Sequence, residues 1–71
     1  MTPADLAAWR AHLGYSQRAA AAALGVTLAT YQRLERGADW ADGAVVKIDR
    51  RTELACAALA AGLDEWRPAA S

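Results

Sequence analysis

The feature that most constrains this sequence is the end of one predicted helix at Gly25 followed almost at once by the start of the next at Thr27. Ser16 is a favoured helix N-cap, and Gly25, one short helix further on, supplies the left-handed conformation that ends a helix. Thr27 is a second N-cap directly after this turn, and Gly37 ends the segment that Thr27 starts. Helices joined by so short a link must cross in close contact. The sequence therefore predicts a helix-turn-helix unit over residues 16–36.

Five consecutive alanines, Ala19–Ala23, lie inside the first of these helices. Between a serine cap and a glycine stop they are predicted to be helical rather than a low-complexity spacer. On a helical wheel Ala20 and Ala21 share a face with Leu24, and the other three alanines lie on the opposite side. We expect Ala20 and Ala21 to face inward, where a neighbouring helix requires small side chains. At the outer positions alanine is the best helix former.

Residues that start and end helices also occur in the rest of the chain. Thr2 caps a first helix that stops at Gly14, and Asp49 caps a closing helix predicted over residues 49–62. Between them, after the helix-turn-helix unit, lies a loop, residues 37–48, whose Val-Val-Lys-Ile run is predicted to be briefly extended. Alanine and leucine dominate and strand formers are sparse. The predicted fold class is therefore all-α, a compact bundle of four or five short helices.

Length and composition limit the organisation and the chemistry. The chain has 71 residues, which predicts a single domain, residues 1–66, followed by a frayed tail, residues 67–71. One cysteine, Cys56, and one histidine, His12, leave no basis for a disulfide or a metal site. No nucleophile–base arrangement or phosphate-binding glycine loop indicates an enzyme, a cofactor or a small-molecule ligand. With no membrane span or signal peptide in the pattern, we expect a soluble, intracellular protein.

Formal net charge is zero, but the charge is unevenly distributed. The first half, up to Arg36, has a balance of +2, and the remainder has a balance of −2, since four arginines face Asp5 and Glu35 in the first half. A basic region beside an acidic remainder is compatible with a polyanionic partner, because the local field matters more than the total charge.

The three tryptophans are predicted to be packing residues rather than parts of a ligand cage. Trp9 lies at the margin of the apolar face of the first helix, so we expect it to pack against the loop or the tail. Trp40 lies in the loop and Trp66 near the end of the chain. The closing helix is apolar on all sides from Leu54 to Ala61. Its outer side therefore needs a cover, either the C-terminal "LDEW" segment or a second chain.

Residues 6–37, "LAAWRAHLGYSQRAAAAALGVTLATYQRLERG", resemble the helix-turn-helix domain of the Cro/C1-type (XRE-like) family of phage and bacterial repressors. The match extends more loosely over the closing helix, and the loop that holds Trp40 departs from the family pattern. The matching positions are Gly14, Ser16, Gln17, Ala21, Leu24, Gly25, Val26, Thr27, Glu35 and Gly37.

The resemblance implies a lambda-repressor-like fold and DNA binding, with the helix over residues 27–36 in the major groove. It also implies an ion pair between Arg10 and Glu35 that holds the first helix to this reading helix. The positions that match base-reading or adjacent residues are Thr27, Leu28, Ala29, Gln32 and Arg33. The positions that match phosphate contacts are Gln17, Arg18 and Arg36.

Elementary chemistry agrees with these assignments. On the predicted reading helix, Tyr31 and Leu34 point inward and Ala29, Gln32 and Arg33 lie on the opposite side. Arginine can offer two donors to guanine, and glutamine can pair with the edge of adenine. We therefore expect Arg33 and Gln32 to be the main polar readers.

Two functions follow from this sequence. The first is a small transcriptional regulator, a repressor from a phage or a mobile element, that binds an inverted-repeat operator in double-stranded DNA as a homodimer. The second is a protein-interaction adaptor or antitoxin-like module with little DNA affinity, which the zero net charge favours. The candidate dimer surface comprises Leu54, Ala55, Ala58, Leu59 and Trp66.

Overall fold

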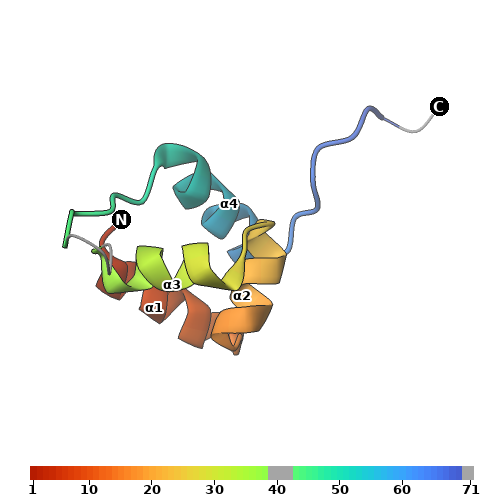
Figure 1. The fold of residues 1–71 in the computed structure, drawn as a ribbon. Helices are drawn as coiled ribbons and strands as arrows, with labels where there is room; N and C mark the ends of the chain where they lie inside the picture. The colour runs from red at the N-terminus through yellow and green to blue at the C-terminus, as the bar shows by residue number, and fades with distance from the viewer. Residues whose placement is uncertain (39–42, 70–71) are drawn as a thin grey trace.

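Four helices make up the regular structure of the protein in a computed structural model, which describes residues 1–38 and 43–69 (Figure 1). The helices, in chain order, are α1 (Pro3–Leu13), α2 (Gln17–Leu24), α3 (Leu28–Arg36) and α4 (Arg50–Ala60). The all-α prediction is confirmed, with four helices rather than five in the described part of the chain. Residues 63–69 are exposed and have no regular secondary structure, so this segment does not cover α4.

Every helix starts on the cap that the sequence predicts. In each case the cap side chain accepts a hydrogen bond from the backbone N–H three residues further on, which satisfies one of the N–H groups left without a partner at the start of a helix. Thr2, Ser16, Thr27 and Asp49 are the four caps. At α4, hydrogen bonds from the Thr52 side chain and from the Thr52 N–H, together with the neighbouring Arg51, lower the pKa of the Asp49 carboxyl to about 2.

The turn between α2 and α3 depends on the backbone of Gly25. This residue has φ 73°, and a Cβ built there would meet no atom within 4 Å, so the requirement is conformational rather than steric. The N–H of Gly25 donates to the carbonyl of Ala22 at 3.1 Å, and that of Val26 donates to the carbonyl of Ala21 at 3.0 Å. These bonds close α2, and the cap of α3 follows at once.

Gly37, at the end of α3, is constrained by space as well as by φ. Its φ is 80°, and a Cβ there would lie 2.8 Å from Cγ of Pro3. The end of α3 therefore rests directly on the start of α1. Beyond it, an isolated antiparallel bridge joins Ala38 and Val45, and the N–H of Val46 donates to the carbonyl of Gly37 at 3.1 Å. Of the Val-Val-Lys-Ile run predicted to be extended, Val45 forms this bridge and residues 46–48 have no regular secondary structure. Trp40 lies outside the described residues.

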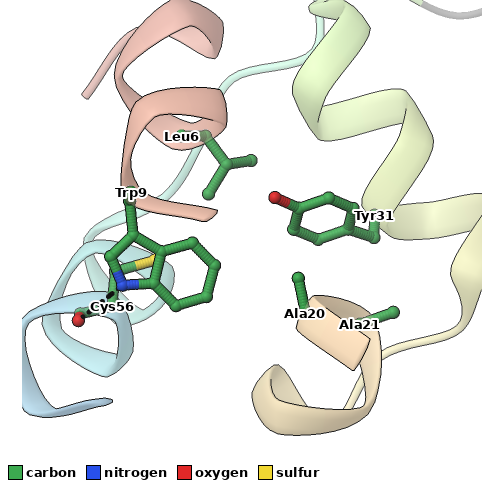
Figure 2. Close-up of a cluster of buried hydrophobic side chains, with 6 residues drawn as sticks. All are labelled: Leu6, Trp9, Ala20, Ala21, Tyr31 and Cys56. Atoms are coloured by element: carbon green, nitrogen blue, oxygen red, sulfur yellow. Dashed lines mark hydrogen bonds between the residues drawn. The ribbon is translucent and has the colours of Figure 1, made fainter. Parts of the chain in front are cut away.

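A small apolar core receives side chains from all four helices (Figure 2). Tyr31, Leu6 and Cys56 are its largest fully buried side chains, and Trp9 is buried beside them. Ala20 and Ala21 are also buried, with exposed fractions of 0% and 3%, whereas the other three alanines of the run are exposed. The interpretation of the alanine run as two inward and three permissive positions is confirmed.

Trp9 packs against α4, so the expectation that it packs on the loop or the tail was wrong. Its indole Nε1 donates to the backbone carbonyl of Cys56 at 2.9 Å, and its ring meets Tyr15 edge-on at 5.9 Å between centroids. Trp9 lies one turn beyond Leu6 on α1, so both side chains enter the core that α4 covers. The indole N–H thereby finds the partner that a buried tryptophan needs.

Replacing Ala21 with leucine should destabilise the protein, because the added carbon atoms have no space between α2 and the rest of the core. We expect Ala21→Leu to lower the free energy of unfolding by about 1–3 kcal/mol, the usual cost of overpacking, as measured by denaturant titration. The matched control is Ala22→Leu, at an exposed position of the same helix, which should change stability little. Equal stabilities for the two variants would contradict the inward assignment of Ala21.

Candidate nucleic-acid interface

One side of α3 is buried and the other is open to solvent. Tyr31 is fully buried, whereas Ala29, Gln32 and Arg33 are exposed. Thr27, at the cap, is exposed as well. Because α2 and α3 cross through a turn of only a few residues, the start of α2 lies beside this open side of α3. We call the exposed side formed by residues 27, 29, 32 and 33 the reading face.

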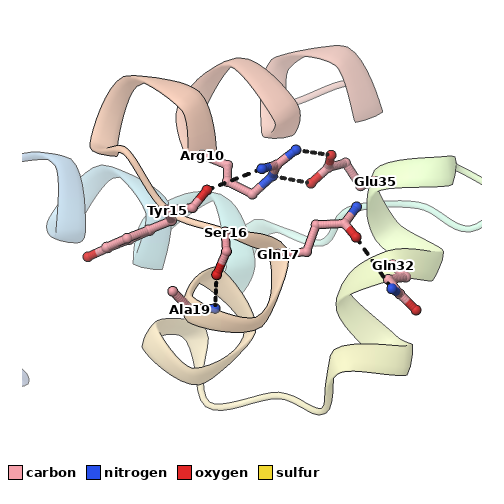
Figure 3. Close-up of polar contacts among 7 residues, drawn as sticks. All are labelled: Arg10, Tyr15, Ser16, Gln17, Ala19, Gln32 and Glu35. Carbon is pink, nitrogen blue, oxygen red and sulfur yellow. Dashed lines mark hydrogen bonds and ion pairs between the residues drawn. The ribbon is translucent and has the colours of Figure 1, made fainter.

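A bidentate ion pair fixes α3 to α1 behind the reading face (Figure 3). Nε and Nη2 of Arg10 donate to the two carboxylate oxygens of Glu35, each at 2.9 Å. Nη1 of Arg10 donates to the backbone carbonyl of Tyr15 at 3.1 Å. One guanidinium therefore holds α1, the link to α2, and α3 in a fixed arrangement.

The ion pair is mostly withdrawn from water. The side chains of Arg10 and Glu35 are 26% and 11% exposed. The hydrogen bonds from Arg10 lower the pKa of the Glu35 carboxyl, and Glu35 in turn raises the pKa of Arg10. Burial, together with the nearby Glu35, raises the pKa of the Tyr31 hydroxyl, which lies next to the pair. Glu35 is therefore ionised and Tyr31 neutral near pH 7.

A second polar contact reaches from this pair to the reading face. Nε2 of Gln32 on α3 donates to Oε1 of Gln17, the first residue of α2, at 3.3 Å (Figure 3). Gln17 also contributes to the lowered pKa of Glu35. A shallow polar hollow is lined by Gln17, Gln32, Glu35 and Arg36.

A comparison with protein families matches residues 6–48 to the family described as "Helix-turn-helix". This match covers more than half of the chain. The chain belongs to the Cro/C1-type (XRE) helix-turn-helix family. Membership in this non-enzymatic family implies DNA binding and transcription regulation. No curated protein and no solved structure matches the chain.

The predicted base-reading residues of this helix-turn-helix domain differ in their solvent exposure and in the hydrogen bonds that their side chains make. Ala29, in the first turn of α3, and Arg33, in its second half, are exposed, whereas Leu28 is half-buried. The Thr27 hydroxyl accepts from the N–H of Thr30 at 3.1 Å and donates to its hydroxyl at 3.0 Å. The structure thus gives the Thr27 side chain a capping role, and it joins the exposed amide of Gln32 to that of Gln17.

The predicted phosphate-contacting residues flank the reading face. Arg18 is exposed on the first turn of α2, and Gln17 lies half-buried next to it. Arg36, at the end of α3, is half-buried, and its Nε donates to the backbone carbonyl of Ala38 at 2.8 Å. This bond turns the Arg36 side chain toward the loop.

The residues of the candidate dimer surface differ in exposure. Leu54 on α4 and Trp66 in the tail are 55% and 86% exposed. Leu59 is half-buried and packs against the core, because it lies three residues after the buried Cys56 and turns toward the same side of α4; its place in a dimer surface stays a prediction. Ala55 and Ala58 are half-buried.

Two hydrogen-bonded contacts on this surface could not be predicted from the sequence. The bond between Gln17 and Gln32 and the third bond of Arg10, to a backbone carbonyl, depend on how α2 crosses α3 and carry no sequence signal of their own. Among the described residues, no group of three or more His, Cys, Asp or Glu side chains could hold a metal ion. Within the same residues, no helix is long and apolar enough to span a membrane.

The ion pair between Arg10 and Glu35 should contribute strongly to stability through coupling. We expect Arg10→Ala or Glu35→Ala alone to lower the free energy of unfolding by about 3 kcal/mol, because each leaves a partly buried charge without its partner. The double variant should lose less than the sum of the two, as measured by denaturant titration. The control cycle uses Glu65 and Arg67, an exposed pair 3.4 Å apart, where coupling should be negligible. Additive losses at positions 10 and 35 would contradict this role.

Proposed function

We propose that this protein is a sequence-specific repressor, from a phage or a mobile element, that binds double-stranded DNA as a homodimer. Residues 27–36 enter the major groove, while Gln17 and Arg18 at the start of α2 contact phosphates. A two-fold dimer binds an operator of two inverted half-sites, one or more helical turns apart. The observation that carries this proposal is the exposed reading face on a helix whose position the Arg10–Glu35 pair fixes.

The exposed side chains on α3 suit the chemistry of direct readout. Arg33 can donate two hydrogen bonds to O6 and N7 of guanine, and Ala29 allows close approach to a thymine methyl group. Gln32, held by Gln17, joins the reading face to the backbone-contacting start of α2. This pairing favours a shared role for Gln32, in which it contacts the edge of the site and orients Gln17 toward a phosphate. Arg33 is then the principal reader.

A second function, a helix-turn-helix adaptor or antitoxin-like module with little DNA affinity, is favoured by the zero net charge and the exposed Leu54 and Trp66. Binding of random-sequence duplex DNA, followed by fluorescence anisotropy against salt, separates the two functions. For a repressor, log affinity should fall linearly with log salt concentration, with a slope of about 0.9 per phosphate contact. Absent or salt-independent binding would contradict the repressor and favour the adaptor.

Substitutions of Arg33 and Arg18 should affect DNA binding in different ways. We expect Arg33→Ala to reduce discrimination at one base pair by about 1–3 kcal/mol, because it removes a base contact. Arg18→Ala should weaken binding to all sequences alike and lower the salt slope by about one, because it removes a phosphate contact. The measurement is anisotropy on sites selected from a random DNA pool and on random duplex. Equal losses on both DNAs for Arg33→Ala would remove Arg33 from the readers.

A further inference from the structure

An open groove that is mostly apolar lies between α3 and the first half of α4, to one side of the reading face. Leu24, Val26, Leu34 and Ala55 provide its apolar lining. Its volume is about 430 Å³, within the ~300–1,000 Å³ of clefts that enclose small organic groups. This space is large enough for an indole ring. Of its lining residues on α3, Leu34 packs against the core, whereas Thr30 is hydrogen-bonded to Thr27 at the edge of the reading face.

The rim of the groove carries more positive than negative charge. Lys47 and Arg51 are exposed cations at its edge, and the Arg51 side chain is 93% exposed. Among the described lining residues, the carboxylate of Asp49 accepts from the N–H of Thr52 at 2.9 Å and from Nη2 of Arg51 at 3.0 Å, so the ion pair offsets part of the Arg51 charge and the net positive charge of this rim comes from Lys47. An acidic segment with an apolar side chain would therefore match both the lining and the rim.

The tail of this chain has that composition. Leu63 and Trp66 are 62% and 86% exposed, and Asp64 and Glu65 lie between them. The N–H of Leu63 donates to the carbonyl of Ala58 at 2.9 Å, which fixes the direction in which the tail leaves α4. From that end of α4 the tail extends away from the helices (Figure 1), whereas the groove flanks the opposite, first half of α4.

We propose that the groove binds the tail of a second copy of this chain, so that two copies exchange tails reciprocally. Trp66 fills the apolar groove of the partner copy, and Asp64 and Glu65 face Lys47 and Arg51 at its rim. The exit direction of the tail favours the partner's groove over the groove of its own copy. Two reciprocal contacts bury both exposed tryptophans, each of which can contribute ~150–250 Å² of surface. This inference rests on the proposed homodimer and names its interface.

Sedimentation equilibrium of the full chain, from micromolar to hundred-micromolar concentration, tests the apolar part of the contact. We expect a concentration-dependent dimer whose dissociation constant rises at least about 30-fold in Trp66→Ala, since a docked tryptophan is a typical hot spot. Val45→Ala is the matched control, because Val45 is 79% exposed but does not line the groove. It should leave the dissociation constant unchanged. A dimer that Leu54→Ala dissociates while Trp66→Ala does not would overturn tail exchange in favour of an α4 face.

Charge reversal tests the rim independently. Asp64→Lys with Glu65→Lys should weaken the dimer about tenfold or more, and Lys47→Glu with Arg51→Glu should do the same, because like charges then face each other. Combining all four substitutions should restore the affinity to within about threefold of that of the unmodified chain. Helix content by circular dichroism verifies that each variant is folded. No recovery in the folded quadruple variant would overturn the pairing of tail and rim.

The failure of tail exchange and the failure of the proposed homodimer give different results. A dimer unaffected by Trp66→Ala overturns tail exchange and leaves the homodimer. A monomer, both free and on operator DNA, overturns both. Fluorine NMR with 5-fluorotryptophan, in which the Trp66 signal is assigned from Trp66→Phe, identifies the remaining case. If the chemical shift of the Trp66 signal indicates a buried side chain at every concentration, the tail binds the groove of its own copy, and tail exchange is overturned. A chemical shift that changes with protein concentration supports tail exchange.

Discussion

The close approach of α2 to Tyr31 of α3 is the constraint on which the rest of this structure depends. Ala20 and Ala21 present only methyl groups to the core in which the Tyr31 ring lies fully buried (Figure 2). With small side chains on one helix and a large ring on the other, the two helices can be joined by the short turn at Gly25. A larger residue on α2 would force the helices apart, and the turn could not then direct the start of α2 and the exposed side of α3 to one surface.

Polar contacts extend this geometry from the core to the surface. Arg10 binds both oxygens of Glu35 and a backbone carbonyl in the link before α2, so α1 constrains both helices of the pair. Gln17 and Gln32 then join α2 to α3 at the surface itself. Because most of this network is shielded from water, its hydrogen bonds are directional restraints on the orientation of α3. Because α3 is held in this way, its backbone loses no conformational entropy when its side chains bind a partner.

The extent of sequence-based prediction follows from which features are local. Caps and glycine stops act within one helix turn, so the four helix starts, the turn at Gly25 and the two inward alanines could be predicted from spacing alone. The partner of Trp9 could not, because it depends on where α4 crosses α1, and no local sequence signal fixes that crossing. The packing of Leu59 against the core could not be predicted for the same reason: an all-apolar helix does not reveal which side faces the core until its neighbour is placed. The Arg10–Glu35 pair was accessible only through the family resemblance, since two residues 25 positions apart have no local signal.

Zero net charge alone is a weak argument against DNA binding, because some of the acids are already engaged within the fold. Of the two acids in the first half of the chain, Asp5 closes the capping box of α1 with Thr2, and Glu35 is paired with Arg10. Asp49, Glu53, Asp64 and Glu65 belong to the cap of α4, to α4 itself and to the tail. With a screening length of about 8 Å in physiological salt, a phosphate bound at α3 in the proposed complex would respond mainly to charges close to that helix. The net charge of the chain is therefore no measure of the field at α3, because Arg10 already engages the carboxylate of Glu35 on that helix.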